Sequence, residues 1–260
     1  MDARIVGWSH TKFGRLEGDT LESLIKSAAT EAMTSAGIAA SDVDGIWLGH
    51  FNAGMVRDGF ASSLALQADD ALRFTPATRV ENACASGSAA IHAARNAIRA
   101  GEARVALVIG AEKMTAQGTA EVTDALMQAG YAAEEDGQSF PMIFARFADA
   151  YFQANGDHSA ALAQIAAKNH RNALANPLAH LQKEVGFEFC NTVSERNPII
   201  APPLRMTDCS LISDGAAARQ LAGQAGEMQR KGAALGAVFN MGGSGVANYV
   251  SILERMGGAL

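Results

Sequence analysis

This sequence has few cysteines, no long apolar run and no excess of positive charge. The 260 residues include 3 cysteines, too few for a disulfide-stapled secreted domain and typical of a reducing compartment. No stretch approaches the roughly 20 apolar residues of a membrane span, and the N-terminus lacks the pattern of a signal peptide. A formal net charge of -6 argues against nucleic acid or an anionic membrane as a partner. We therefore expect a cytoplasmic protein.

Motifs that bind metals or nucleotides are also missing or weak. The sequence contains no C-x-x-C or H-E-x-x-H pattern, and its three cysteines lie far apart. The glycine run at 240–248, NMGGSGVAN, lacks the lysine of a phosphate loop and favours a tight turn. We therefore expect no metal and no permanently bound cofactor.

The first 114 residues alternate between strand and helix patterns. Strands are expected at 3–8, 44–50, 77–82 and 102–114, and helices at 18–37 and 84–101. In the first helix an apolar stripe runs from Leu21 to Ala36, Asp19 and Glu22 make a capping-box pattern, and Gly37 ends the helix. This alternation predicts an α/β fold with parallel strand pairs and helices on the faces of the sheet.

The pattern changes between residues 115 and 203, a segment that holds five of the six prolines. Helices are expected at 141–156 and 159–174, followed by a long irregular run. A long excursion of this kind is usually functional and often covers a substrate. The chain then returns to the sheet at 213–218, continues in a helix-like stretch at 218–232, and ends in a strand, a glycine turn and a strand.

The stretch ENACASGSAA, residues 81–90, places Cys84 between a strand and a helix. The first amides of a helix have no internal partner and carry partial positive charge, which stabilises a thiolate. Small neighbours leave room for a substrate, so Cys84 is either an acyl-accepting nucleophile or a buried small hydrophobe. His92 is too far along the helix, by roughly 12 Å of rise, and no other histidine makes a recognisable pair with Cys84.

Longer motifs resemble the thiolase family. ENACASGSAA followed by RVALVIGAEKMT resembles its nucleophile loop, helix and strand. KNHRNALANPLAHLQKE, PLRMTDCSLISDGAAA and FNMGGSGVANYVSILER resemble the sterol-carrier-protein type of thiolase in particular, and acetyl-CoA acetyltransferases belong to the same superfamily. The resemblance implies a layered α/β fold (helix, sheet, helix, sheet, helix), with the first half complete and the second truncated.

The resemblance also implies a domain plan. Residues 1–114 and 204–218 form the N-terminal half, 115–203 form an inserted loop domain that covers coenzyme A, and 219–260 are a remnant of the C-terminal half.

The chemistry implied by the resemblance is acyl transfer between coenzyme A thioesters through an acyl-cysteine. It corresponds to an acetyl-CoA C-acetyltransferase or a 3-ketoacyl-CoA thiolase, with acyl-CoA or acetyl-CoA as substrate and a homodimer or higher homo-oligomer as the assembly. By motif, Cys84 is the nucleophile, and its own N–H and that of Gly242 match an oxyanion hole. Asn240 stands where other thiolases carry a second cysteine. No coenzyme A contact, acyl chain length or reaction direction follows from the motifs.

The sequence departs from the family in lacking its H-D-C-F-like and G-H-P loops. Without their histidine, only the helix terminus favours the thiolate, by roughly 0.3 to 2 kcal/mol. The chain as written is therefore expected to be weak or inactive. Two explanations stay open: a segment is missing from the sequence at the join between Ala218 and Arg219, or the gene has lost it. Matching motifs on both sides of the join favour the first.

Two other functions remain possible at this level. The first is a non-catalytic thiolase-like subunit that binds acyl-CoA or a partner enzyme, which the missing histidine loops favour. The second is a relative of the ketoacyl synthases, which share the fold and a cysteine at a helix start. KNHRNALANP and NMGGSG favour a thiolase over this second alternative.

Overall fold

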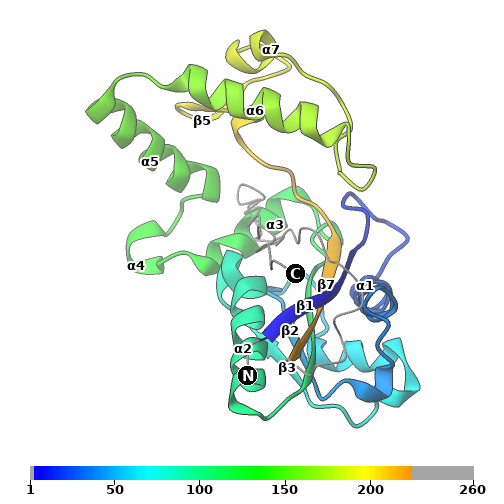
Figure 1. Ribbon diagram of the computed structural model, residues 1–260. Helices are drawn as coiled ribbons and strands as arrows, with labels where there is room; N and C mark the ends of the chain where they lie inside the picture. The colour runs from blue at the N-terminus through cyan, green and yellow to red at the C-terminus, as the bar shows by residue number, and fades with distance from the viewer. Residues whose placement is uncertain (1–2, 224–260) are drawn as a thin grey trace.

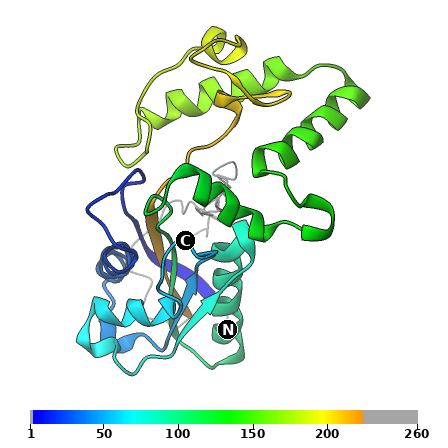
Figure 2. The same ribbon diagram turned by 180° about the vertical axis from the view of Figure 1, so that it is seen from behind.

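The computed structural model describes residues 3–223, which form a helix-flanked sheet with a helical arch above it (Figures 1 and 2). The elements of the sheet region are β1 (Ala3–His10), α1 (Leu21–Ala36), η1 (Ala40–Asp42), β2 (Gly45–Gly49), η2 (Ala61–Ala68), η3 (Asp70–Leu72), β3 (Ala77–Val80), η4 (Ala83–Ala85), α2 (Ser86–Ala100), β4 (Val105–Glu112) and β7 (Gly215–Gly223). Between β4 and β7 lie α3 (Thr119–Leu126), η5 (Met127–Ala129), α4 (Ala132–Glu135), α5 (Phe140–Asn155), α6 (Ser159–Ala173), α7 (Phe187–Asn191), β5 (Ile199–Ala201), β6 (Leu204–Arg205) and η6 (Met206–Asp208).

The main sheet has five strands in the order β1-β7-β4-β2-β3. β2 pairs in parallel with both β3 and β4, whereas β7 is antiparallel to β1 and β4. The expected α/β fold with parallel pairs is therefore confirmed. The parallel strands bring the turns after β2, β3 and β4 to one edge of the sheet.

The two faces of the sheet are buried by different helices. Alternating residues of β4 separate between them: Leu107 and Ile109 pack with α1, and Ala106 and Val108 pack with α2. The expected apolar stripe on α1 is confirmed, since its residues from Leu21 to Met33 are buried at helical spacing. The structure corrects the cap of α1, because Thr20 and Ser23 form the capping box and Asp19 only accepts a hydrogen bond from the Ser23 hydroxyl.

The last described residues differ from the helix expected at 218–232. Residues 218–223 belong to strand β7 and not to a helix. β7 lies between β1 and β4 and pairs with both, so its backbone groups are satisfied only in an extended conformation. β7 also continues without interruption through Ala218 and Arg219, between which a missing segment is expected.

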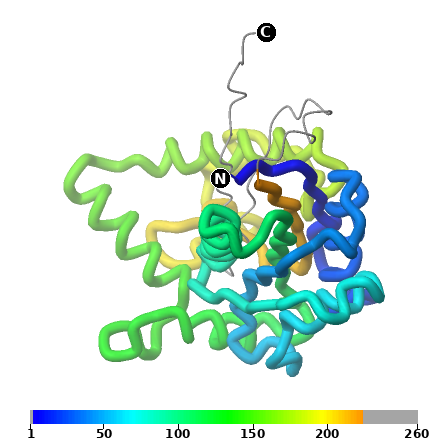
Figure 3. Tube along the Cα trace, turned by 60° about the horizontal axis from the view of Figure 1, so that its bottom comes forward, coloured from blue at the N-terminus to red at the C-terminus, as the bar shows by residue number. Residues whose placement is uncertain are grey.

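The segment between β4 and β7 folds into the arch of α5, α6 and α7, which Figure 3 shows projecting beyond the sheet region. The expected helices at 141–156 and 159–174 correspond to α5 and α6, and the irregular run also contains α7 and the β5–β6 hairpin. This hairpin crosses the domain boundary expected between residues 203 and 204.

Two buried polar side chains organise the far end of the arch. The Arg205 guanidinium pairs with Asp208 at 2.9 Å and donates hydrogen bonds to Asn191 and to the carbonyl of Ser159. Asn197 donates from Nδ2 to three carbonyls of the α7 region and accepts from the Thr207 N–H. Both side chains are buried, and their polar groups are hydrogen-bonded. These bonds connect the segments of the arch, whose apolar clusters are small.

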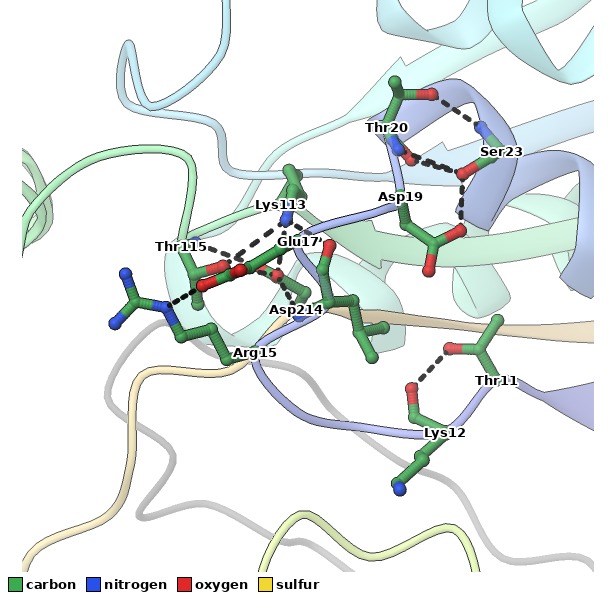
Figure 4. A network of polar contacts seen from close by, with 11 residues as sticks. Thr11, Lys12, Arg15, Glu17, Asp19, Thr20, Ser23, Lys113, Thr115 and Asp214 are labelled. Carbon is green, nitrogen blue, oxygen red and sulfur yellow. Dashed lines mark hydrogen bonds and ion pairs between the residues drawn. The ribbon is translucent and has the colours of Figure 1, made fainter.

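Both stems of the arch meet at one buried ion pair (Figure 4). Lys113 Nζ lies 2.6 Å from Asp214 Oδ2, and the Asp214 carboxylate also accepts from the N–H and hydroxyl of Thr115 and from the Leu16 N–H. Lys113 further donates to the Leu16 carbonyl at 2.8 Å. The cluster therefore joins the start of the excursion, its end, and the loop after β1.

Replacing Asp214 by Asn should destabilise the protein strongly, because it leaves the Lys113 ammonium buried without a counter-charge. Loss of one partner of a buried pair costs about 3 to 5 kcal/mol. Urea unfolding of wild type, Asp214→Asn and the exposed control Asp58→Asn would measure this free energy. A loss below about 1 kcal/mol would show that the pair is not a stabilising constraint.

The stability of the protein should also depend on the protonation of Asp214. Burial raises the pKa of Asp214, but hydrogen bonds from Lys113, Thr115 and Leu16 outweigh it and hold the pKa below its usual range. A lowered native pKa stabilises the fold above the unfolded value of about 3.9, and this stabilisation is lost as pH falls through the native value. Denaturation at several pH values between about 6 and 2 should show this loss in wild type and a smaller one in Asp214→Asn. Equal slopes for the two proteins would contradict the assignment.

Candidate functional site

Cys84 lies in a tight turn that joins β3 to α2. The turn is a short 3-10 helix, Ala83–Ala85, so Cys84 lies two residues before the start of α2 and is not in its first turn as expected. Ala83 has a φ of 45°, a left-handed conformation that costs a non-glycine residue roughly 1 to 2 kcal/mol. Backbone strain of this kind persists only where surrounding contacts impose it, and it is concentrated at functional sites.

Hydrogen bonds of Ser86 and Glu81 hold this turn. The Asn82 N–H donates to Ser86 Oγ at 2.9 Å, and the Ser86 hydroxyl donates to the Ala83 carbonyl at 2.7 Å. Glu81 accepts from the Ala83 N–H. Cys84 is partly exposed, and the N-cap residue of α2, Ala85, provides no side-chain cap. The positive end of the α2 dipole therefore lies beside an accessible thiol.

A close approach between β2 and α2 sets the position of the turn. A Cβ added to Gly49 would lie 2.7 Å from the Ser86 carbonyl oxygen and 2.8 Å from the Gly87 backbone. These are backbone atoms that cannot rotate away, so only glycine allows the start of α2 to pack this closely on the sheet. The paired glycine on β4, Gly110, has no atom within 4 Å of such a Cβ.

The loop after β2 is fixed at the same edge of the sheet. Arg79 donates to the carbonyls of His50 and Phe51 at 3.0 and 2.8 Å, and Glu112 accepts from the backbone N–H groups of Phe51 and Asn52. The His50 ring is buried, with Nδ1 2.8 Å from the Ala111 carbonyl oxygen and 3.2 Å from Glu112. These contacts make a rigid frame beside the Cys84 turn.

The sequence alone did not reveal this frame. Its only signal is that the charged residue Glu112 stands at the end of a strongly apolar strand. Which backbone amides such a carboxylate binds depends on pairing between strands far apart in the sequence.

The remaining histidines contact other parts of the chain. His10 stacks on Trp8 and Phe13, and His158 packs against Tyr151. His180 Nδ1 lies 2.7 Å from Ser213 Oγ; burial lowers the pKa of His180, the Lys12 charge lowers it further, and Asp214 opposes the shift. His92 is exposed on α2.

The other two thiols have different surroundings. Cys190 is buried, and burial raises its pKa. Cys209 is partly exposed, and burial together with the Asp208 charge raises its pKa. Neither thiol follows a strand at the start of a long helix, so these two cysteines serve as internal comparisons for Cys84.

Two of the expected site residues, Asn240 and Gly242, lie outside the described residues. Between residues 3 and 223, no group of three or more histidine, cysteine or acidic residues is arranged to hold a metal ion. No helix in that same range is both long and apolar enough to cross a membrane.

Comparison with known proteins identifies the family. Residues 3–224 match the family model "Thiolase, N-terminal domain", and the chain belongs to the thiolase family. An acetyl-CoA acetyltransferase of Methanocaldococcus jannaschii is 36% identical over 224 residues, which are 84% of this chain and 54% of the relative. That of Methanothermobacter thermautotrophicus is 34% identical over 84% of this chain and 56% of the relative. The chain thus spans about half the length of these curated relatives.

More distant matches agree with the resemblance read from the motifs. Sterol carrier protein 2 of Bos taurus is 28% identical over 85% of this chain and 41% of its own length. The crystal structure of human mitochondrial 3-ketoacyl-CoA thiolase in complex with CoA superposes with a TM-score of 0.66 at 18% identity. The match covers 85% of this chain and 66% of that chain, and it shows a thiolase fold.

Replacing Gly49 by Ala should push the start of α2 away from the sheet and displace Cys84. Overpacking of this kind costs about 1 to 3 kcal/mol. The matched control is Gly110→Ala, on the paired residue of β4, which should leave stability and thiol reactivity unchanged because the added methyl meets open space. Unfolding free energies and the rate of Cys84 alkylation would measure both effects. Equal behaviour of the two variants would mean that the close approach does not position the turn.

Proposed function

We propose that this chain carries the acyl-accepting half of a thiolase-type acyltransferase, with Cys84 as the nucleophile. The observation that carries the proposal is the strained strand-to-helix turn, which presents a partly exposed thiol beside the start of α2 in a chain of the thiolase family. The relatives named acetyl-CoA acetyltransferase support acyl-CoA, including acetyl-CoA, as the substrate class.

The proposed step is thioester exchange. The Cys84 thiolate attacks the carbonyl carbon of an acyl-CoA, an S–C bond forms, and the bond from that carbon to the coenzyme A sulfur breaks. Coenzyme A leaves as a thiolate and takes up a proton from solvent, and the acyl group remains on Cys84. Backbone N–H groups of Cys84 and Gly242 are the proposed donors to the charge that develops on the carbonyl oxygen. Asn240 is proposed to stand where other thiolases carry a second cysteine.

The second step transfers the acyl group to free coenzyme A or to the carbanion of acetyl-CoA. It needs an acid–base group, and the two histidine motifs that supply it in the family do not occur in this sequence. We therefore propose that the chain as written accepts an acyl group but turns over slowly or not at all.

The wider organisation belongs to the same proposal. The arch between β4 and β7 is the proposed cover for coenzyme A, a homodimer is the proposed assembly, and the cytoplasm is the proposed compartment. The alternative function is a thiolase-like subunit that binds acyl-CoA or a partner enzyme without turnover. The exposed aromatic side chains on α5, Phe147 (68% exposed) and Tyr151 (54%), favour a partner on that helix.

Incubation with acetyl-CoA should add one acetyl group to the wild-type protein, measured by intact-protein mass spectrometry. The Cys84→Ser variant should lose the adduct, because a serine hydroxyl is not ionised at neutral pH. Cys209→Ser is the matched control: it removes a thiol of similar exposure whose pKa is raised, and it should leave the adduct unchanged.

Each alternative predicts a different result from the same experiment. An adduct that survives Cys84→Ser would remove Cys84 as the nucleophile. No adduct on any variant, combined with measurable acetyl-CoA binding by calorimetry, would favour the non-catalytic subunit.

A further inference from the structure

A small cavity lies on the α2 side of the sheet, between α2 and the strands β1, β4 and β7. Its volume is about 30 Å³, and its lining includes Trp8, His10, Gly87, Ile91, Gly110 and Arg219. Because one water molecule needs about 10 to 15 Å³ by this measure, the cavity holds a group of two or three heavy atoms. Cys84 is not part of its lining.

Arg219 is the unusual residue of this cavity. It lies in the interior of β7, paired with Trp8 on β1 and Val108 on β4, and only 8% of its surface is exposed. Its Nη1 atom is buried without a hydrogen-bond partner among the described residues. Burial lowers the pKa of Arg219, yet a guanidinium remains protonated in proteins. A buried charge of this kind is costly unless an anion pairs with it.

The start of α2 adds to the positive field of the cavity. Gly87 lies in the first turn of this 15-residue helix, whose N-cap residue Ala85 makes no side-chain hydrogen bond to the turn. The dipole of α2 is positive at this end. One full charge and one partial charge of the same sign therefore face a cavity that is otherwise lined largely by apolar and small residues.

We propose that this cavity binds a single carboxylate group, whose three heavy atoms match its volume, paired with the Arg219 guanidinium. The planar guanidinium matches a carboxylate, and one cation balances one negative charge. The apolar neighbours Trp8, Ile91 and Val108 disfavour a doubly charged phosphate, and the volume is too small for a phosphate ester. The site is separate from the acyl-transfer proposal and does not depend on it.

The absence of a side chain at Gly110 keeps the cavity open. An added Cβ at this residue would meet nothing within 4 Å, and the residue has extended strand backbone that any amino acid can adopt. A larger side chain there would occupy the space without changing Arg219. Gly110→Leu is therefore a second route to closing the site.

The test is a thermal-shift titration of the full chain with sodium acetate at constant ionic strength, with sodium chloride as the balancing salt. A ligand that binds only the native state raises the melting temperature, because it stabilises that state by RT ln(1 + [L]/Kd). Acetate should raise it for wild type and for the control Arg4→Gln, which removes an exposed arginine from the same sheet. In Arg219→Met the apparent acetate affinity should fall by about tenfold or more.

Two further results decide the assignment. Without acetate, Arg219→Met should melt at a higher temperature than wild type, because it removes an unpaired buried charge. Gly110→Leu should weaken acetate binding while Arg219 is intact, which covers the case in which Arg219→Met does not fold. Equal acetate shifts in wild type and Arg219→Met, or a larger shift with phosphate than with acetate, would overturn the proposal.

The carboxylate could also come from an aspartate or glutamate of another molecule of this chain. Sedimentation at increasing protein concentration separates the two sources. Self-association that acetate and Arg219→Met both abolish would assign the site to a side chain, whereas acetate binding by a monomer would assign it to a small molecule. If neither acetate binding nor Arg219-dependent association is observed, the cavity does not have this role.

Discussion

The buried pair of Lys113 and Asp214 is the constraint on which the arrangement of this chain depends. Three segments that are distant in sequence end at it: the loop after β1, the exit from β4 and the entry to β7. The removal of two charges from water costs several kcal/mol per ion, so the pair alone would not stabilise the fold. Its benefit comes from the surrounding N–H and hydroxyl donors, which leave no oxygen of Asp214 unpaired. The network therefore specifies how the arch joins the sheet.

The Cys84 turn depends on a different constraint, the distance between β2 and α2. Gly49 lets the helix start lie against the sheet, and the chain between Val80 and Ser86 must then turn in very few residues. The left-handed conformation of Ala83 follows from this shortage of chain. The close packing of α2 on β2 thus explains two features together. The backbone is strained at Ala83, and the partly exposed Cys84 thiol lies at the start of a helix.

Periodic features of this protein could be predicted from the sequence, and non-local ones could not. The stripe on α1, the helices α5 and α6 and the strand-to-helix position of Cys84 all follow from local patterns. The cap of α1 was misplaced by one residue because Asp19 and Thr20 are both good N-cap residues, and tertiary packing decides between them. Arg219 and Gln220 gave residues 218–223 a helix-like pattern, since polar residues are rare in a buried central strand. The partners of Asp214 and Glu112 depend on strand order, which no local pattern encodes.

The two steps of the proposed acyl transfer make different demands on this structure. Acceptance of an acyl group needs an accessible thiol and positive potential around it, and the described residues supply both at Cys84. Release to a second thioester needs a group that moves a proton at the reacting carbon. The histidines of the described range are held by Trp8, Ala111, Tyr151, Lys183 and Ser213 or lie exposed on α2, and the structure assigns that role to none of them. The proposed acylation of Cys84 can therefore be tested as a single event, separately from the proposed second step.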